Sequence, residues 1–299
     1  MKRLVRARWI ALAMCLMGLS HCRGAERRVT VAGLDVWIWN QEKPGDAPKP
    51  VIIFSHGFHG CGTQSRFLTE ALAANGYIVF APNHRDATCS GGASRWSEEP
   101  SMPFAQPALW NEASFRDRGE DIRRLIQALG QDPRWDRSVD WQRLALAGHS
   151  LGGYTVLGLA GGWPSWKLPG VRAVLALSPY SQPFLVQRTL GGLSAPVMYQ
   201  GGTLDFGATP ALQKSMGAFE QSPEPKYYVE FERVGHFAWA NIGKHAAREG
   251  IVAYSLAFLN HYVKGEPADP ALTRARPEVA QIRYVSELGR SGPAGKEGR

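Results

Sequence analysis

The sequence contains few cysteines and no apolar run long enough to suggest a membrane span. Only four of its 299 residues are cysteine. The apolar run at residues 9–19 is shorter than the roughly 20 residues that a membrane-spanning helix needs. No repeat with a fixed period is present, which argues against a solenoid. Hydrophobic residues make up 44% and charged residues 20% of the chain, as in a globular protein that buries a core.

The central part of the chain also lacks a basic region. The formal net charge is +8, but residues 1–24 contain five basic and no acidic residues, and residues 264–299 contain seven basic and five acidic residues. The part between them is therefore close to neutral. No motif that reads DNA or RNA is present, so a nucleic-acid partner is not expected. His, Cys and acidic residues do not recur with the spacing of a metal site, and we expect no metal or organic cofactor.

The first 24 residues have the three parts of a secretory signal peptide: a basic segment at 2–8, the apolar run at 9–19 and small residues near its end. We expect export to a periplasm or beyond, with no membrane span left after cleavage. An uncleaved anchor is the alternative. A lipoprotein site at Cys22 is disfavoured because a bulky histidine precedes it.

Short apolar strands alternate with helices through most of the chain. Residues 51–54 are wholly apolar, as in the buried strands of a parallel sheet. A hairpin or strand pair is expected at 29–40, further strands at 77–80, 144–147, 171–177, 196–200 and 227–231, and helices at 64–75, 115–129, 151–160 and 244–263. This alternation predicts an α/β fold with a doubly wound, mostly parallel central sheet flanked by helices.

Two segments do not follow this alternation of strands and helices. Residues 88–112 are rich in Gly, Ser and Pro and carry Trp96, Phe104 and Trp110. Long loops of this kind often cover a functional site, and we expect a cover over a pocket. The segment after residue 263 has scattered Pro, Gly and charge, which predicts a poorly ordered tail. The expected organisation is a leader at 1–24, one domain at 25–263 and a tail at 264–299.

The most specific motif is Gly148-His149-Ser150-Leu151-Gly152-Gly153, set between an expected strand and an expected helix. The G-x-S-x-G spacing lets a serine occupy a tight strand-to-helix turn in which bulky neighbours would clash. The Ser150 Oγ is then exposed at the carboxyl edge of the sheet, and the Leu151 amide is placed to stabilise an oxyanion. We therefore expect a nucleophile at Ser150 rather than an incidental serine in a glycine-rich turn.

A nucleophilic serine needs a base and an orienting carboxylate, which in this kind of sheet follow in the order Ser, Asp or Glu, His. Asp205 and His236 each come directly after an expected strand, where open α/β sheets place their sites. The other histidines precede the serine, adjoin it or fall in the last helix. We expect Ser150, Asp205 and His236 to form a catalytic triad, and we weigh Asp205 against three earlier carboxylates, Asp86, Asp117 and Asp121.

A second oxyanion donor is expected in the loop after the first central strand, Ser55-His56-Gly57-Phe58-His59-Gly60. Its glycines let the backbone turn its amides toward the serine. The Phe58 N–H is the favoured donor, and the His59 N–H is the alternative.

Together these motifs resemble a known family. The HGF loop, GHSLGG, Asp205 and the GHF histidine are similar to the α/β-hydrolase fold over residues 50–263. Within that fold they resemble the dienelactone-hydrolase-like branch that contains platelet-activating-factor acetylhydrolases and cutinase-like polyester hydrolases. The resemblance implies a serine carboxylic-ester hydrolase that forms an acyl-enzyme and acts on small or polymeric esters. Dienelactone hydrolases proper use a cysteine nucleophile, so Ser150 favours ordinary carboxylic esters.

Other activities stay open at this point. A serine amidase, peptidase or acyltransferase uses the same triad, whereas a non-catalytic binding module is disfavoured because all three triad residues are present. We expect Tyr180, His59 and Trp239 to contact the substrate. Tyr180 occupies the place of an aromatic residue in polyester hydrolases, where it either stacks on an acyl group or packs in the protein.

Cys61 and Cys89 follow the ends of two strands that a parallel sheet brings to the same edge. In an oxidising compartment we expect them to form a disulfide. The alternative is a pair of small buried apolar side chains.

Overall fold

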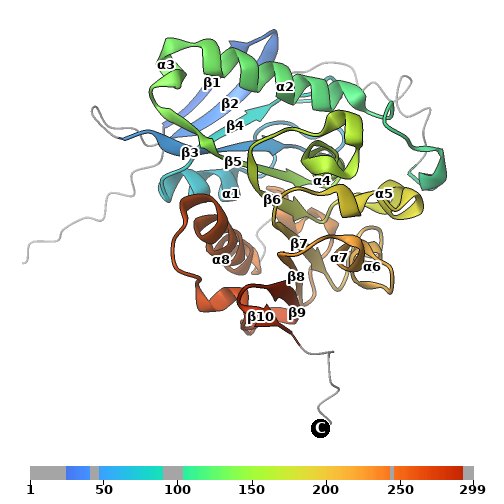
Figure 1. The fold of residues 1–299 in the computed structure, drawn as a ribbon. Helices are drawn as coiled ribbons and strands as arrows, with labels where there is room; N and C mark the ends of the chain where they lie inside the picture. Colours follow the sequence, from blue (N-terminus) through green and yellow to red (C-terminus); the bar gives the residue numbers. More distant parts are fainter. Residues whose placement is uncertain (1–24, 41–46, 90–103, 243–245, 292–299) are drawn as a thin grey trace, which may run out of the picture.

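A computed structural model describes residues 25–40, 47–89, 104–242 and 246–291 of the chain (Figure 1). Its strands are β1 Ala25–Val31, β2 Leu34–Asn40, β3 Lys49–Ser55, β4 Ile78–Pro82, β5 Val139–His149, β6 Val171–Leu177, β7 Val197–Gly202, β8 Lys226–Phe231, β9 Val279–Ser286 and β10 Gly289–Arg290. Its α-helices are α1 Arg66–Ala74, α2 Arg116–Gln131, α3 Pro133–Asp136, α4 Leu151–Leu157, α5 Gln182–Gln187, α6 Thr209–Gln213, α7 Ala218–Gln221 and α8 Arg248–Leu259.

Within the described residues the strands form one sheet in the order β1-β2-β4-β3-β5-β6-β7-β8-β9-β10. The six strands from β4 to β8 in this order pair in parallel, and the pairs at the two edges are antiparallel. The predicted α/β fold with a mostly parallel central sheet is confirmed.

The alternation of side chains along a strand explains why residues 51–54 of the central strand β3 are all apolar. In β3, Val51 and Ile53 face one hydrophobic core, and Ile52 and Phe54 face the other. Helices α2 and α4 cover the first face, and α1 and α8 cover the second (Figure 1). Both faces are thus buried, as parallel sheets require.

The expectation of a poorly ordered tail is wrong for residues 264–291. Strand β9 pairs antiparallel with β8, from Val279 opposite Phe231 to Val285 opposite Lys226. Because β9 is nearly at the edge of the sheet, its side chains stay half-exposed, so its sequence mixes polar and apolar residues and gives only a weak strand signal. The last eight residues and the expected leader at 1–24 lie outside the described residues.

The loop predicted at 88–112 is described only in part, and Trp96 lies outside the described residues. Trp110 is fully buried and packs on Tyr180 and Phe115, with ring centroids 4.7 and 5.0 Å apart. It therefore belongs to the core rather than to a cover. In the part of the chain that the structure describes, no helix combines the length and apolar character needed to cross a membrane.

Candidate active site

Ser150 occupies a sharp turn between β5 and α4. Its φ of 55° and ψ of −116° are strained for a residue with a side chain. A Cβ on Gly152 would lie 1.9 Å from the Ser55 carbonyl oxygen, and one on Gly148 would lie 2.3 Å from the Gly152 carbonyl oxygen. The glycines of the motif are needed because backbone passes this close to them.

The structure brings Ser150, His236 and Asp205 together although they are far apart in sequence. The Ser150 Oγ lies 2.9 Å from His236 Nε2, and His236 Nδ1 lies 3.2 Å from Asp205 Oδ2. Asp205 is buried just after β7, and His236 opens the short 3₁₀ turn His236–Trp239. Burial opposes ionisation of Asp205, but the hydrogen bond and charge of His236 outweigh it and lower the pKa of Asp205.

A fourth residue, Ser178, takes part in this contact and was not foreseen from the sequence. It follows β6, and its hydroxyl donates to Asp205 Oδ2 while lying 2.8 Å from His236 Nδ1. A hydroxyl can donate one hydrogen bond and accept others, so it can accept the Nδ1–H of His236 at the same time. The sequence feature that indicates Ser178 is its position directly after an expected strand, in the segment Ser178-Pro179-Tyr180.

The hydrogen bonds of the loop after β3 distinguish between the two amides considered for the oxyanion. The His59 N–H donates to Asp86 Oδ2 at 2.9 Å. That amide is therefore committed to a carboxylate, which favours Phe58 as the donor from this loop. Leu151 opens α4, where the first amides of a helix have no partner within the helix. The roles of Phe58 and Leu151 stay predictions.

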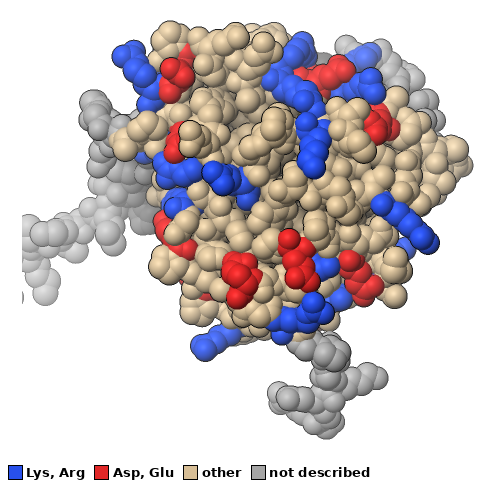
Figure 2. All heavy atoms as spheres, viewed as in Figure 1, with Lys and Arg blue, Asp and Glu red and all other residues tan. Residues whose placement is uncertain are grey.

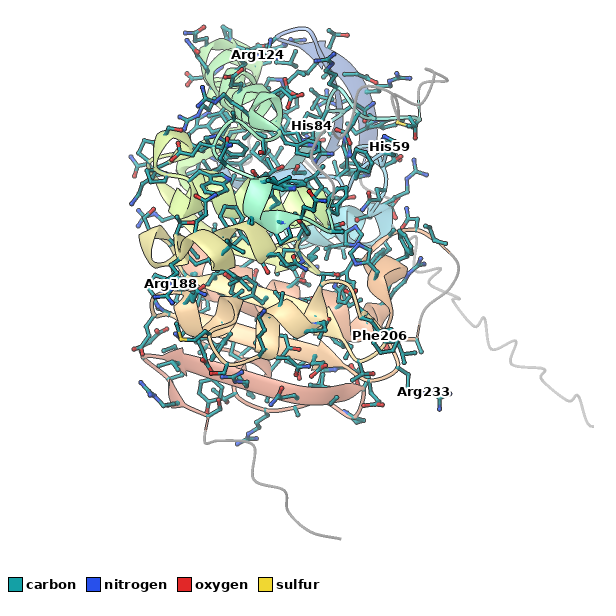
Figure 3. All side chains as sticks on the ribbon, turned by 90° about the vertical axis from the view of Figure 1, so that its right-hand side faces the viewer. His59, His84, Arg124, Arg188, Phe206 and Arg233 are labelled. Carbon is teal, nitrogen blue, oxygen red and sulfur yellow. The ribbon has the colours of Figure 1, made fainter. Side chains whose placement is uncertain are left out.

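A large open cavity of about 1190 Å³ surrounds Ser150 and His236. Much of its lining is apolar: Phe58, Phe104, Tyr180, Leu204, Phe206, Phe237 and Ile242. Phe206 is 79% exposed and projects from the surface at the rim (Figure 3). Among the described residues that line the cavity, Asp205 is the only carboxylate and Arg66 the only lysine or arginine, and Arg66 is paired with Glu26. The space next to the serine therefore suits an uncharged, apolar molecule.

Two of the three residues expected to contact substrate, Tyr180 and His59, do line this cavity. The Tyr180 hydroxyl donates to the Phe104 carbonyl at 2.8 Å, so it also packs against the protein. The expectation for Trp239 is wrong. Its side chain is fully buried and its Nε1–H donates to Gln200 Oε1 at 2.9 Å, because the turn after His236 directs it into the core under β7.

Ser55, His84 and Asp121 form a second Ser-His-Asp arrangement. The Ser55 Oγ is 2.9 Å from His84 Nε2, and His84 Nδ1 is 3.0 Å from Asp121 Oδ2. All three residues are buried and none lines the cavity. Burial and the Arg118 charge lower the pKa of His84. This arrangement has the bonding pattern of a triad but no access for a substrate, and it engages Asp121 away from His236.

Arg118 joins the buried arrangement to the loop after β3. It donates to both oxygens of Asp86, at 3.0 and 2.8 Å, to the His56 carbonyl at 2.7 Å and to the Gly57 carbonyl at 3.2 Å. Burial opposes the ionisation of Asp86, but the Arg118 charge outweighs it and holds the pKa of that carboxyl well below its usual range. Asp86 is thus an ion-pair partner rather than the acid of the triad.

The expected disulfide is not formed in the structure, where Cys61 and Cys89 are free thiols. Partial burial and a hydrogen bond with the Cys61 thiol raise the pKa of Cys89 to about 12. The two thiols are therefore neighbours, and their oxidation to a disulfide stays a prediction.

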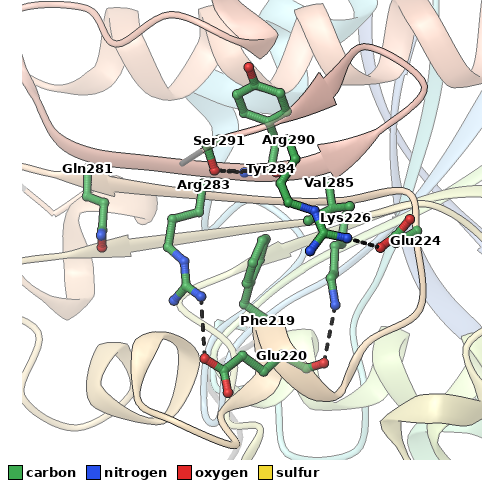
Figure 4. A pocket seen from close by; sticks show the side chains of 10 residues that line it. All are labelled: Phe219, Glu220, Glu224, Lys226, Gln281, Arg283, Tyr284, Val285, Arg290 and Ser291. Atoms are coloured by element: carbon green, nitrogen blue, oxygen red, sulfur yellow. Dashed lines mark hydrogen bonds and ion pairs between the residues drawn. The ribbon is translucent and has the colours of Figure 1, made fainter. Parts of the chain in front are cut away.

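A second cavity of about 510 Å³ lies between α7 and the β9–β10 hairpin (Figure 4). Its carboxylates are paired, Glu220 with Arg283 at 3.5 Å and Glu224 with Arg290 at 3.2 Å, and Lys226 donates to the Glu220 and Ser222 carbonyls at 3.2 and 2.7 Å. On the face shown in Figure 2, basic and acidic groups are likewise interspersed. Ser150, Asp205 and His236 line the first cavity and not this one.

Comparison with known proteins identifies the family of the chain. The family model for Hydrolase_4, described as serine aminopeptidase S33, matches residues 46–200, slightly more than half of the chain. Cutinase est2 of Thermobifida alba is 24% identical, over 81% of this chain and 69% of its own. Cutinase 2 of Thermobifida cellulosilytica is 25% identical, over 72% and 69%. Platelet-activating factor acetylhydrolase of Canis lupus familiaris is 26% identical, over 40% and 33%.

The residues that the family model matches include strands β3 to β6 and the strand-to-helix turn at Ser150. The match extends from the strand before the oxyanion loop to the strand that precedes Asp205. The chain therefore belongs to the Hydrolase_4 family of α/β-hydrolases, a family of serine hydrolases.

Proposed function

We propose that this protein is a carboxylic-ester hydrolase in which Ser150 is the nucleophile, His236 the general base and acid, and Asp205 the carboxylate that orients His236. The observation that carries the proposal is the hydrogen-bonded chain from Ser150 Oγ to His236 to Asp205, which opens into an apolar cavity. The relatives that are cutinases and acetylhydrolases support an ester as the bond that is cleaved.

The geometry supports a two-step acyl transfer. His236 Nε2 takes the Ser150 hydroxyl proton as Oγ bonds to the ester carbonyl carbon, and the carbonyl electron pair moves onto the oxygen. The Phe58 and Leu151 amides stabilise that oxyanion. When it collapses, the bond to the alkoxy oxygen breaks and His236 returns the proton to the leaving alcohol. Water, deprotonated by His236, then attacks the acyl-enzyme in the same way and releases the acid.

An aminopeptidase, which the family description names, is less well supported by the lining of the cavity. A peptide amino terminus is a cation and needs a carboxylate or other acceptors near the scissile bond. The only carboxylate among the described lining residues, Asp205, is already engaged by His236 and Ser178. We therefore infer an uncharged ester with apolar groups on both sides of the carbonyl.

Turnover of a p-nitrophenyl butyrate substrate tests the proposal. Ser150→Ala should lower kcat/KM by on the order of 10³–10⁶-fold with no change in unfolding, because triad members act as a unit. Ser55→Ala is the matched control, since Ser55 has an equivalent Ser-His-Asp arrangement without access to the cavity. It should keep most of its turnover. Equal losses in both variants, or retained activity in Ser150→Ala, would refute the assignment. A matched nitroanilide should be cleaved far more slowly than the ester.

We also propose that the protein is exported, on the basis of the composition of residues 1–24. The mature protein recovered from outside the cytoplasm should then lack these residues, which intact mass measurement will show. Recovery of the full-length chain in a membrane fraction would instead support an uncleaved anchor.

A further inference from the structure

Gln64 lies where the three loops of the proposed active site meet, just before α1. Its side-chain Oε1 accepts the Gly57 N–H at 2.9 Å, in the loop that carries the proposed oxyanion donor Phe58. Its Nε2 lies 2.7 Å from Nδ1 of His149, the residue before the nucleophile. Its backbone carbonyl accepts the Asn241 N–H at 2.6 Å, in the segment after His236.

The direction of each hydrogen bond in this chain follows from the groups involved. A backbone N–H can only donate, so the amide oxygen of Gln64 must face Gly57 and its NH₂ must face His149. An amide NH₂ can only donate, so His149 Nδ1 carries no proton. The proton of the neutral ring is then on Nε2, which lies 2.8 Å from the His236 carbonyl oxygen, an acceptor. Donation therefore runs from Gly57 through Gln64 and His149 to the backbone of His236.

The surroundings of His149 agree with a neutral ring. His149 is buried, and burial together with the nearby charge of His236 lowers the pKa of His149 to about 3. The two rings are 4.9 Å apart between centroids. A protonated His149 would place a second positive charge beside the proposed base.

The packing around Gln64 shows that its position is restricted. A Cβ on Gly60 would lie 2.1 Å from Gln64 Oε1, so the turn of the loop has a glycine where the amide passes. The next residue, Ser65, donates to the Trp239 carbonyl at 2.6 Å and gives the segment a second link to the base loop.

We propose that Gln64 is a positioning residue that sets the His149 tautomer. Through this tautomer it keeps the loop that carries Phe58, the turn that carries Ser150 and the loop that carries His236 in fixed relative positions. This proposal rests on the proposed esterase function for its kinetic consequences, but the tautomer of His149 does not depend on that function. Gln64 also lines the cavity, so a direct contact with substrate is the competing role.

Two substitutions separate these roles. Gln64→Met keeps a side chain of similar length but removes both amide hydrogen bonds. Gln64→Glu keeps an acceptor for the Gly57 N–H, yet its carboxylate cannot donate to His149 Nδ1, which must then take a proton. Gln142→Met, an exposed glutamine near the start of β5, is the matched control.

The experiment measures kcat and KM for p-nitrophenyl butyrate and for the octanoate, together with the histidine tautomers by ¹H–¹⁵N NMR at neutral pH. The wild type should show His149 with its proton on Nε2. Gln64→Met should lose about 10²-fold in kcat for both esters with KM little changed, since small displacements of reacting groups can cost this much. Gln64→Glu should show a proton on His149 Nδ1 and a loss of kcat as well.

Several results would overturn the proposal. One is wild-type kcat in Gln64→Met, and another is a wild-type His149 in the Nδ1–H form. A change confined to KM that depends on the acyl chain would assign Gln64 to substrate contact instead. If Gln64→Met does not fold, the test rests on Gln64→Glu. A wild-type kcat in Gln64→Glu together with a proton on His149 Nδ1 would refute the link between the His149 tautomer and catalysis. Failure of the esterase proposal would be seen separately, as activity that survives Ser150→Ala.

Discussion

Replacing Arg118 by methionine should leave the buried Asp86 carboxylate without its positively charged partner. In the folded protein the Arg118 side chain is completely buried, and the Asp86 side chain is 7% exposed. The substitution removes both hydrogen bonds to Asp86 and those to the His56 and Gly57 carbonyls, and it leaves Asp86 with the His59 N–H. Breaking a buried ion pair by removing one partner typically costs about 3–5 kcal/mol.

This cost is a large part of the total stability of a domain, which is roughly 5–15 kcal/mol. For a domain of this size, Tm should fall by roughly 6–20 °C. Urea unfolding of Arg118→Met followed by tryptophan fluorescence measures the free energy of unfolding directly. Arg134→Met is the matched control because Arg134 likewise donates to both carboxylate oxygens of Asp132, but its side chain is 78% exposed. Its stability should hardly change.

The difference in free energy of unfolding between the wild type and Arg118→Met should also depend on pH. Because the pKa of Asp86 is depressed in the folded wild type, its stabilising contribution is present above the unfolded pKa of about 3.9 and is lost as pH falls through the folded value. Without Arg118, burial should raise the pKa of Asp86 instead. Lowering the pH should then protonate the Asp86 carboxylate and remove its unpaired charge. The difference in free energy of unfolding between the wild type and Arg118→Met should become smaller below about pH 5. Coincident unfolding curves for Arg118→Met and Arg134→Met at neutral pH would refute the reasoning.

Three further predictions concern single groups. Ser178→Ala should lower kcat more than KM, because Asp205 and His236 lose a shared hydrogen-bond partner; steady-state kinetics equal to wild type would contradict this. Gly152→Ala should abolish soluble folded protein, since its Cβ would lie 1.9 Å from the Ser55 carbonyl oxygen, whereas Gly191→Ala, with open space around it, should fold normally by circular dichroism. Under oxidising conditions Cys61 and Cys89 should pair, with a mass loss of two hydrogens and a stabilisation of roughly 3–4 kcal/mol; persistent free thiols would exclude the bond.

The central sheet could be predicted from the sequence because its strands are buried on both faces. A parallel strand buried on both faces is largely apolar, as residues 51–54 of β3 are, and its hydrophobic run is therefore visible without knowledge of its neighbours. The nucleophile turn was equally visible, because close backbone contacts at Gly148 and Gly152 restrict both positions to glycine. The order of Ser150, Asp205 and His236 along the chain followed from the strand ends at which such sheets place their sites.

Strand β9 and the position of Trp239 could not be predicted in the same way. An edge strand is half-exposed, so its composition does not differ clearly from that of a loop. Trp239 is close to His236 in sequence, but a single turn of 3₁₀ helix directs it to the core rather than to the cavity. Proximity along the chain does not fix the direction of a side chain.

The sequence by itself determined which residue types were available for chemistry and where the buried strands lie, because both follow from local composition. Only the tertiary structure decided which polar groups bond to one another. Among the residues that the structure describes, two Ser-His-Asp arrangements form from residues far apart in the chain, and of these two the one containing Ser150 lines the large cavity. The commitment of the His59 amide to Asp86, and the links from Gln64 to three loops, likewise arise because the sheet brings distant strand ends to one edge.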